Sequence, residues 1–574
     1  MRKTVIRVFC LAMVLAMALC SVAAADTYYN DPGTLPIVKE PTTLLVGMPV
    51  SQHINDYYTN YQTLKMQEDT GFTFEFEVYP SDEYLTKVEL MIAAGGKDLP
   101  DVLTGRSFSQ QVIMSWVDAG YIVPMTEYYD TLYYWGDTSL ELDPTLDIDY
   151  VKKYITSYDG EIYGEFSFNS TKNNQYSGSR LNIYRPWLKA LEMDIPSTTD
   201  ELYEYLVAVR DNDMNGNGDP TDEIPLSGYN DAVGNLRKFL MTPFVYTQNE
   251  YWTADDGVIG VCFNTEGWRE GLKWVNKLYS EGLIDPAYFT QDQNSLTAVC
   301  SQEPQVLGSY VRISTSNMAA SDLDRYNYDR IEQLANSADP DAQVLTSVVP
   351  SLPSITALIT TNCEVPEAAY MWLDYMSGYD MSVLTRYGVE GQEWDWVDVE
   401  ATQAALKEFW ENYEGGNWLV EFYGEDALPV VGTRFFSATS WGTMQDTWWG
   451  QMGPNVMTEE LQQTFGQKIP ETEIEIASYV NEYSARHQLE EAISLRDDSR
   501  IVAGLVYTED EQEVITEYYT DIKTYVEEMW AAFVVGTQDI NDDAVWNAYL
   551  DQLNRLNVDA CIEATQSCYT RMNG

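Results

Sequence analysis

Apolar and polar residues along the N-terminal part of the chain follow two alternating periods. Thr43–Met48 and Asp98–Leu103 are short apolar runs typical of buried strands, and Phe72–Val78 alternates apolar and polar residues as a half-buried strand does. Thr59–Asp69 and Glu83–Ala94 instead have apolar residues at helical spacing. This succession of strands and helices predicts an α/β domain in which helices cover both faces of a largely parallel sheet.

A second set of patterns follows Tyr163. Thr198 precedes Glu201 by three residues, which is the spacing of a capping box at the start of a helix, and the apolar face after it predicts a helix that ends near Arg210. Further amphipathic helices are expected at Glu266–Leu283, Glu367–Ser377, Gln403–Tyr413 and Ile515–Val534. The chain has no short-period repeat, so a solenoid or propeller is not expected. Two α/β lobes account for these patterns.

The N-terminus has the layout of a secretory signal. Three basic residues precede an apolar run from Val8 to Val22, and Ala23-Ala24-Ala25 follows. A membrane anchor is the alternative, but a run of about 15 apolar residues is shorter than the ~20 that a bilayer needs. Residues 1–25 are therefore expected to be a signal peptide. The mature chain is expected to begin near Asp26 and to be extracellular, at the cell surface or in the periplasm.

Cys20 offers another route to the cell surface, a lipid anchor on the exported chain. The residue before it, Leu19, is bulky, whereas bacterial lipoprotein signals usually have Gly or Ala at that position. Cleavage after Ala25 is therefore favoured. No later stretch has about 18 consecutive apolar residues, so no other segment is expected to span a membrane.

The composition excludes several kinds of partner and chemistry. The 90 acidic residues against 33 basic ones give a net charge of −57, and such a surface repels phosphate backbones, so nucleic acid is not expected as a partner. His53 and His487 are the two histidines of the chain, which excludes multi-histidine zinc sites. The cysteines after the signal peptide are sparse and odd in number, which predicts buried thiols rather than a disulfide framework.

An acidic, glycine-containing loop, Asp211–Glu223, follows the Thr198 helix. Ca²⁺ takes about six to eight oxygen ligands, which a loop supplies when side-chain oxygens alternate around a Gly that permits a sharp turn. One register starts at Asp213 with Gly218 in sixth position, and another starts at Asp211 with Gly216 in sixth position. Neither register has the apolar eighth residue of a standard EF-hand. The ligands expected in the first register are Asp213, Asn215, Asn217, Asp219 through its carbonyl, Asp222 and Glu223.

Crowded carboxylates repel one another unless a cation lies among them, which favours a metal site in this loop over a solvated polar turn. Mg²⁺ is a weaker candidate than Ca²⁺ because it demands tighter octahedral geometry. The loop is distant in the sequence from any catalytic pattern, so the ion is expected to be structural. It would hold the end of a helix against a strand predicted to begin at Ile224.

The Asp213–Pro225 segment resembles a motif of the extracellular solute-binding proteins of carbohydrate ABC importers, family 1, especially the alginate-oligosaccharide-binding type. In that family a helix is followed by an Asp-x-Asn-x-Asn-Gly loop that ends in Asp-Glu-Ile-Pro. The resemblance selects the register that starts at Asp213, although this chain has one more residue between the Gly and the closing Asp-Glu. Other similar segments follow in the family's order: 159–164, 181–190, 277–286, 387–391, 547–556 and 566–571.

This resemblance implies a two-lobed α/β fold of the type II periplasmic-binding-protein kind, with a hinge that the chain crosses more than once. Residues 26–157 and 346–417 are expected to form the first lobe, and residues 158–345 and 418–574 the second. The resemblance also implies a monomeric substrate-binding component without enzymatic activity. Such a protein captures a carbohydrate, in most members an oligosaccharide, between its lobes and delivers it to the permease subunits of an ABC importer.

Eight residues are expected to line the cleft. Open α/β sheets bind ligands beyond the carboxyl ends of their strands, and aromatic faces with a few polar groups suit sugar rings. The candidates that follow predicted strands and the aromatic candidates expected to be exposed are Arg106, Ser107, Tyr229, Asn230, Trp394, Trp396, Trp441 and Trp448. Arg106 would favour an acidic sugar, whereas the net negative charge opposes the capture of polyanions.

The sequence leaves two other functions open. A secreted glycoside hydrolase needs a pair of carboxyl groups about 5–9.5 Å apart, which 90 acidic residues can always supply. No segment, however, has a recognisable catalytic carboxylate context. A surface-binding or sensory module is the third interpretation. A pair of permease genes beside the gene for this chain would distinguish a transport protein from such a module.

Overall fold

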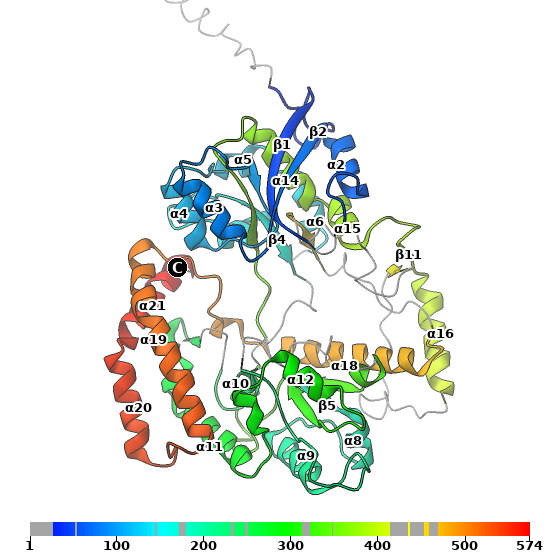
Figure 1. Cartoon of the computed structure of the whole chain (residues 1–574), viewed down its shortest axis with the longest axis vertical. Coiled ribbons are helices and arrows are strands. Elements are labelled where there is room, and N and C mark those ends of the chain that lie inside the picture. Colours follow the sequence, from blue (N-terminus) through cyan, green and yellow to red (C-terminus); the bar gives the residue numbers. More distant parts are fainter. Residues whose placement is uncertain are drawn as a thin grey trace, which may run out of the picture.

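The computed structural model describes residues 27–51, 54–143, 146–170, 180–230, 235–246, 251–312, 322–346, 348–413, 434–436, 453–458 and 469–573. These residues form two α/β lobes, one above the other in Figure 1. The expected signal peptide, including Cys20, lies outside the described residues, as do Trp441 and Trp448. No helix in the described ranges is both long enough and apolar enough to cross a bilayer.

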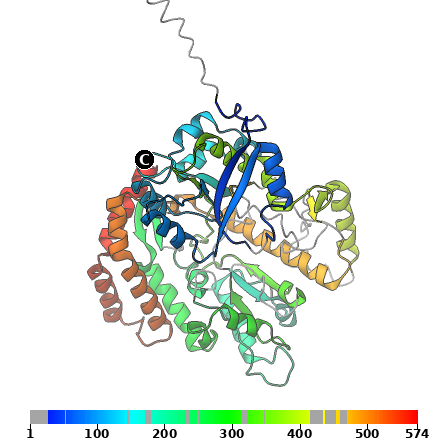
Figure 2. The same cartoon turned by 45° about the horizontal axis from the view of Figure 1, so that its top comes forward.

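The first lobe is built on a six-stranded sheet with the order β13-β4-β10-β3-β1-β2. Its strands are β1 (Thr42–Pro49), β2 (Phe72–Tyr79), β3 (Val102–Leu103), β4 (Glu165–Asn169), β10 (Ser354–Ile359) and β13 (Val456–Met457). β1 is parallel to β3 and, along its whole length, to β2, beside which it runs in Figure 2. β10 is antiparallel to both neighbours because it enters from the second lobe. The prediction of a largely parallel sheet is therefore wrong for this strand, and the sheet is mixed.

The helices of the first lobe include both helices predicted next to its first strands. They are α2 (Tyr61–Thr70), α3 (Tyr84–Ala93), α4 (Gln110–Asp118), α5 (Thr126–Thr131), α6 (Trp135–Leu140), α7 (Ile148–Ile155), α14 (Pro366–Ser377) and α15 (Tyr379–Tyr387). α2 begins where the Asn60 side chain accepts a hydrogen bond from the Thr63 N–H, and it ends at Gly71, whose φ of 79° suits glycine. α14 is buried on all sides from Ala368 to Ser377 and forms the centre of this lobe.

The second lobe contains a three-stranded antiparallel sheet with the order β8-β5-β9 and a separate hairpin. Its strands are β5 (Leu181–Tyr184), β6 (Trp252–Asp255), β7 (Val258–Val261), β8 (Ser309–Val311) and β9 (Tyr328–Ile331). The predicted strand at Ile224 is a short segment that forms single parallel bridges, to Leu307 just before β8, to Ile284 and to Tyr310 of β8, rather than a continuous ladder. The antiparallel pairing again differs from the parallel sheet expected, because β8 and β9 run back toward the hinge from which β5 starts.

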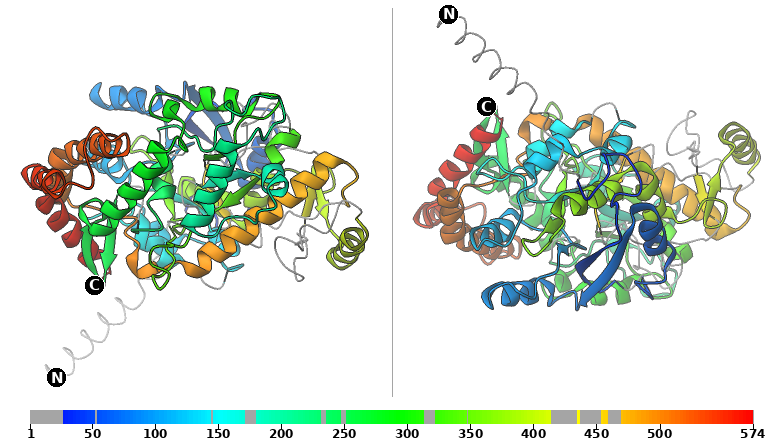
Figure 3. Two further views of the ribbon diagram at one scale, coloured as in Figure 1. Left: turned by 90° about the horizontal axis from the view of Figure 1, so that it is seen from below. Right: turned by 90° about the horizontal axis from the view of Figure 1, so that it is seen from above.

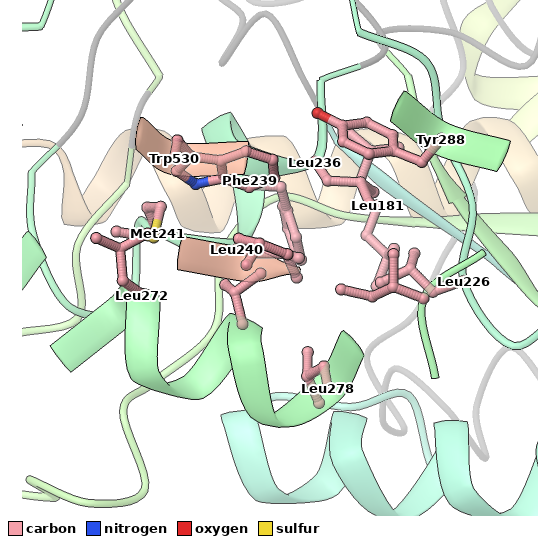
Figure 4. Close-up of a cluster of buried hydrophobic side chains, with 14 of the residues drawn as sticks. Leu181, Leu226, Leu236, Phe239, Leu240, Met241, Leu272, Leu278, Tyr288 and Trp530 are labelled. Carbon is pink, nitrogen blue, oxygen red and sulfur yellow. The ribbon is translucent and has the colours of Figure 1, made fainter. Parts of the chain in front are cut away.

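Helices make up most of the second lobe. They are α8 (Arg185–Ala190), α9 (Thr199–Asp211), α10 (Leu236–Leu240), α11 (Glu266–Ser280), α12 (Gln293–Cys300), α13 (Asp322–Tyr326), α18 (Glu473–Leu495), α19 (Glu509–Val534), α20 (Asp543–Arg555) and α21 (Val558–Asn573). In both views of Figure 3 the last three helices gather on one side of the molecule. Figure 4 shows the core that unites these elements: Leu181 of β5, Leu272 of α11 and Trp530 of α19 point into one cluster.

The boundaries of the helices follow local capping. Thr198 and Glu201 form the predicted capping box at the start of α9. α19 begins at Glu509, earlier than the expected Ile515, because Thr508 and Glu511 form another capping box. The remaining cysteines are free and buried, as predicted: Cys262, Cys300, Cys363, Cys561 and Cys568.

The chain crosses between the lobes more than once, at positions that differ from the expected boundaries. β4 and β13 are strands of the first-lobe sheet, although residues 165–169 and 456–457 were assigned to the second lobe. The reason is burial: Phe166, Phe168 and Val456 belong to the hydrophobic core of the first lobe. The first crossing therefore lies after Asn169 instead of at residue 157, and the chain returns to the first sheet for one more strand near its end.

A small side unit joins the lobes on the flank that carries α16 in Figure 1. It contains β11 (Trp394–Trp396), β12 (Arg434–Phe436) and α16 (Val399–Asn412). Trp410 of α16 packs against Val480 of α18, which ties this unit to the second lobe.

Gly504 lies at a contact between the lobes and is expected to be sensitive to substitution. Its φ is +65°, and an added Cβ would lie 2.6 Å from Tyr154 of α7 and 2.9 Å from Leu352. Gly504→Ala should therefore lower the free energy of unfolding by about 2–4 kcal/mol, the sum of a left-handed backbone penalty and overpacking. Gly282→Ala is the control for urea denaturation: its φ is +74° but no atom lies within 4 Å, so only the backbone penalty applies. Equal losses in the two variants would contradict the contact.

Candidate functional site

A pocket of about 430 Å³ with a polar wall lies in the second lobe. It is lined by Tyr229, Asn230, Gln291, Asp292, Gln293 and Asn294. Its volume lies within the range of small-ligand sites, ~300–1,000 Å³. The structure thus brings together Tyr229 and Asn230, which the sequence pointed to, with four residues that it did not.

This pocket lies at the end of the second-lobe sheet that adjoins the hinge. The segment before Tyr229 runs parallel to β8, through bridges from Ile224 to Leu307 and from Ser227 to Tyr310. The last residue of β8 pairs with Leu181, at which the chain enters this sheet from the first lobe. The chain from Ser227 to Tyr229 therefore leads toward the first lobe, and Figure 1 shows α12, which carries the other wall, on the same side.

Hydrogen bonds hold two of the four amide side chains of the pocket, those of Gln291 and Asn230, in place. The Gln291 Nε2 group donates to Ser227 Oγ at 2.7 Å and to the Gly228 carbonyl at 2.5 Å. On the other wall, the Asn235 Nδ2 group donates to Asn230 Oδ1 at 3.0 Å. Side chains that are already oriented lose less conformational entropy when a ligand binds, so the pocket is preorganised.

Asp292 lies at the edge of the pocket as an ionised carboxylate. It caps α12, and its Oδ1 atom accepts hydrogen bonds from the Ser295 N–H at 2.8 Å and the Ser295 hydroxyl at 2.7 Å. These bonds, first that from the hydroxyl, lower the pKa of Asp292. The Asp-x-x-Ser spacing of a helix N-cap was the signal in the sequence that marks this position.

Arg106 and Ser107 lie on the first lobe, directly after β3, and both are exposed. The hydroxyl oxygens of Ser107 and Ser354, the first residue of β10, are 3.2 Å apart. These residues are at the carboxyl end of a strand, as predicted, and their contact with a ligand remains a prediction.

The tryptophans of the side unit differ in exposure. Trp394 is only 4% exposed, so the prediction of an exposed aromatic side chain is wrong for this residue. Its ring packs with Tyr387 and Met457, and its Nε1 group donates a hydrogen bond to the Gly388 carbonyl. Trp396 is 47% exposed, and its Nε1 group donates to Glu390 Oε1 at 2.8 Å. Trp394 and Trp396 are two residues apart in β11 and therefore lie on the same face of the strand, where their ring centroids are 5.3 Å apart.

The acidic loop after α9 folds around the side chains predicted to bind a metal. Two backbone N–H groups, of Asn217 and Gly218, donate to the Asp213 carboxylate. The Asn217 amide donates to Asp222 Oδ2 at 2.6 Å. The Asp219 carboxylate instead turns outward to the N–H and hydroxyl of Thr221, which lower its pKa, so only its carbonyl is left for a metal. The role of that carbonyl as a metal ligand remains a prediction.

A buried carboxylate oxygen in this loop indicates whether the loop has room and need for a cation. Glu223 is 9% exposed, and its Oε1 atom accepts hydrogen bonds from the N–H groups of Met214 and Asn215. Its Oε2 atom is buried and has no hydrogen-bond partner among the described residues. An oxygen left in this way costs free energy unless a cation binds it.

The carboxylates of the loop do not make a site by themselves. Within the described ranges, no three His, Cys, Asp or Glu side chains are grouped closely enough to hold a metal. The amides of Asn215 and Asn217 lie between the carboxylates and direct their nitrogens at Asp222. The donor set therefore consists of carboxylate, amide and carbonyl oxygens, which suits Ca²⁺ and does not suit a softer metal.

A pair of buried acids in the first lobe was not found by sequence reasoning. Asp374 of α14 accepts hydrogen bonds from the N–H groups of residues 134–136 at the start of α6. Glu165 of β4 accepts hydrogen bonds from the hydroxyls of Tyr129 and Ser377. Burial raises the pKa of Asp374 to about 7. Burial, and then the charge of Asp374, raises the pKa of Glu165. Both are 0% exposed, so their hydrogen bonds hold the core together rather than face a substrate.

The chain is similar to two curated bacterial proteins, although no protein-family model matches it. It is 26% identical to the fructooligosaccharide ABC transporter substrate-binding protein FusA of Streptococcus pneumoniae serotype 4 over 391 residues, which are 67% of this chain and 70% of that protein. It is 23% identical to the lipoprotein LipO of Bacillus subtilis over 342 residues, 58% of this chain and 64% of LipO. The similarity to FusA, an ABC transporter substrate-binding protein, agrees with the resemblance found in the sequence.

Solved structures confirm the two-lobed solute-binding fold. S. pneumoniae FusA in complex with kestose aligns with a TM-score of 0.66 at 20% identity, over 92% of this chain and 99% of that one. A solute-binding protein of Bifidobacterium longum infantis that binds HMO aligns with a TM-score of 0.67 at 17% identity, also over 92% and 99%. An EF-hand mutant of FusA in complex with fructo-nystose also aligns, with a TM-score of 0.65 at 21% identity, as does the alginate-binding protein AlgQ2 without calcium ion, with a TM-score of 0.59 at 19% identity.

Proposed function

We propose that this chain is the exported substrate-binding component of an ABC importer and that it captures an oligosaccharide between its two lobes. The observation that carries this proposal is the combination of a two-lobed fold with a preorganised polar pocket at the hinge side of the second lobe. The similarity to FusA over most of both chains supports the same conclusion. The partners of such a protein are its sugar and the permease subunits that receive it.

The fold suits capture and release without chemistry on the ligand. The chain crosses between the lobes at several places, so the lobes can rotate about these segments while each core stays intact. Oriented amides in the pocket can donate to and accept from sugar hydroxyls. Further contacts with the sugar would form when the lobes close. The candidates for these contacts are Arg106 and Ser107 on the first lobe and Trp396 on the side unit.

We further propose that the loop after α9 binds Ca²⁺ through Asp213, Asn215, Asn217, the Asp219 carbonyl, Asp222 and Glu223. The buried Oε2 atom of Glu223 supports this, since it lacks a partner in the described part of the chain. When bound, the ion would neutralise the crowded carboxylates and fix the end of α9 beside Ile224, which pairs with Leu307 in the second-lobe sheet. Its role would be structural.

Oligosaccharide binding is expected to raise the melting temperature and to leave the sugar intact. A ligand that binds only the folded state at about 100 times its Kd adds ~2.7 kcal/mol of stability. A panel that includes kestose and other oligosaccharides, screened by thermal shift and followed by calorimetry, should give one site per chain. Chromatography of the incubated sugar should show no cleavage product. Hydrolysis of the bound sugar would refute the proposal in favour of a glycosidase.

Two matched glutamine variants test whether the pocket takes part. Gln293 lines the pocket, whereas Gln302 is exposed beyond the other end of α12. Gln293→Ala should weaken binding about 3- to 10-fold, the value of one hydrogen bond, and Gln302→Ala should leave the affinity unchanged.

A further inference from the structure

We propose that the pocket beside α12 selects uncharged oligosaccharides over those that carry carboxylate groups, and that Asp292 sets this preference. The inference rests on the proposed function and concerns the class of sugar that the protein accepts.

The lining of the pocket matches neutral hydroxyl groups. Four of its six residues carry amides, one carries a phenol and one a carboxylate: Asn230, Gln291, Gln293 and Asn294, then Tyr229, then Asp292. Amides donate and accept hydrogen bonds, as sugar hydroxyls do, and an ionised carboxylate accepts from hydroxyls. None of the six residues carries a positive charge, which is the group that would form a charge-assisted bond with a uronic acid.

The start of α12 would attract an anion if the protein did not already place one there. A helix N-terminus has unpaired N–H groups and a partial positive charge, which favour negative ligands. Here the Asp292 carboxylate accepts the Ser295 N–H and hydroxyl, so the protein fills this position with its own charge. Asp292 stays ionised because these bonds lower its pKa. A sugar carboxylate in the pocket would therefore meet a like charge at its wall.

The rest of the chain reinforces this bias. The net charge of −57 gives a negative potential that acts on any anionic ligand approaching the pocket. Arg106, the basic residue that the sequence analysis placed at the cleft, would act in the opposite direction, but it lies on the first lobe, in an exposed position where its charge is screened.

The test compares neutral oligosaccharides with oligouronates of equal length by calorimetry, at fixed free calcium and low salt. The wild-type protein should bind the neutral series at least tenfold more tightly. Asp292→Asn keeps the helix cap, since Asn is an equally good N-cap, and removes the charge. It should strengthen oligouronate binding about fivefold relative to neutral binding, so the ratio of the two affinities is the readout, and this change should shrink at high salt.

Asp398→Asn is the matched control, because Asp398 caps α16 in the same way, away from the pocket. It should change neither affinity. The inference is overturned if the wild-type protein binds oligouronates as tightly as neutral sugars, or if Asp292→Asn shifts both classes equally; the transport function would survive both results. Binding of neither class by the wild-type protein would instead refute the proposed function, and this inference with it.

Discussion

Removal of calcium should lower the melting temperature by about 5–10 °C. An ion present at about 100 times its Kd contributes ~2.7 kcal/mol, and each kcal/mol shifts the transition of a lobe of this size by ~2–4 °C. The physical reason is that the carboxylates of the loop lose their counter-charge when the ion leaves. One of them, Glu223, then has a buried Oε2 atom without a hydrogen-bond partner in the described part of the chain. Scanning calorimetry with a strong chelator, followed by added Ca²⁺, measures the loss and its reversal.

Two carboxyl variants assign this effect to the loop. Glu223→Gln keeps an acceptor for the N–H groups of Met214 and Asn215 but removes the charge, so it should abolish most of the calcium-dependent shift. Asp219→Asn should keep the shift, because the Asp219 side chain accepts hydrogen bonds from Thr221 and is not one of the predicted side-chain ligands. A melting temperature insensitive to chelation in the wild-type protein would disprove the metal site.

The buried acid pair should make the protein less stable as the pH rises from about 5 to 8, at saturating calcium. Burial raises the pKa of Asp374 to about 7 and also raises that of Glu165, whereas the unfolded chain titrates near pH ~4. Between these values the folded state holds more protons than the unfolded state. The free energy of unfolding therefore falls as the pH rises from the unfolded-state pKa to the folded-state pKa. For Asp374 the loss is on the order of 4 kcal/mol over this whole interval, of which about 2.7 kcal/mol falls above pH 5.

A glutamine variant isolates the contribution of Glu165. Glu165→Gln replaces the protonated acid by a neutral amide that can still bond Tyr129 and Ser377, so it should flatten the pH dependence and stabilise the protein at pH 8. Glu204→Gln, on the exposed face of α9, is the control and should leave the slope unchanged. Urea denaturation at several pH values gives the measurement. A slope that is unchanged in Glu165→Gln would show that the acid is not protonated in the folded protein.

Local patterns predicted the elements that depend on neighbouring residues. The spacing of apolar residues identified β1, β2, α2 and α3, and the Thr198–Glu201 box fixed the start of α9, because both are properties of a few consecutive positions. The acidic loop was also recognisable, since its donor residues lie within a dozen positions. Tyr229 was found because it follows the apolar segment at Ile224, which was predicted to be a strand.

Features that depend on distant partners were not predictable in the same way. The sequence around Glu165 reads as an ordinary strand, and only its contact with α14, more than 200 residues later, makes it a buried acid. Trp394 has the appearance of a surface aromatic until Met457, from another strand, covers it. Gln291–Asn294 form the pocket wall only because α12 packs beside the segment that ends at Tyr229.

The late return of the chain to the first sheet bears on biosynthesis. β13 supplies the strand next to β4, so the N-terminal lobe cannot be completed until Val456 and Met457 have been synthesised. Contacts between such distant positions form slowly, so the first sheet stays incomplete for longer during synthesis. A chain that stopped before β13 would leave β4 as an open edge, and such truncated products should aggregate rather than accumulate as half-molecules.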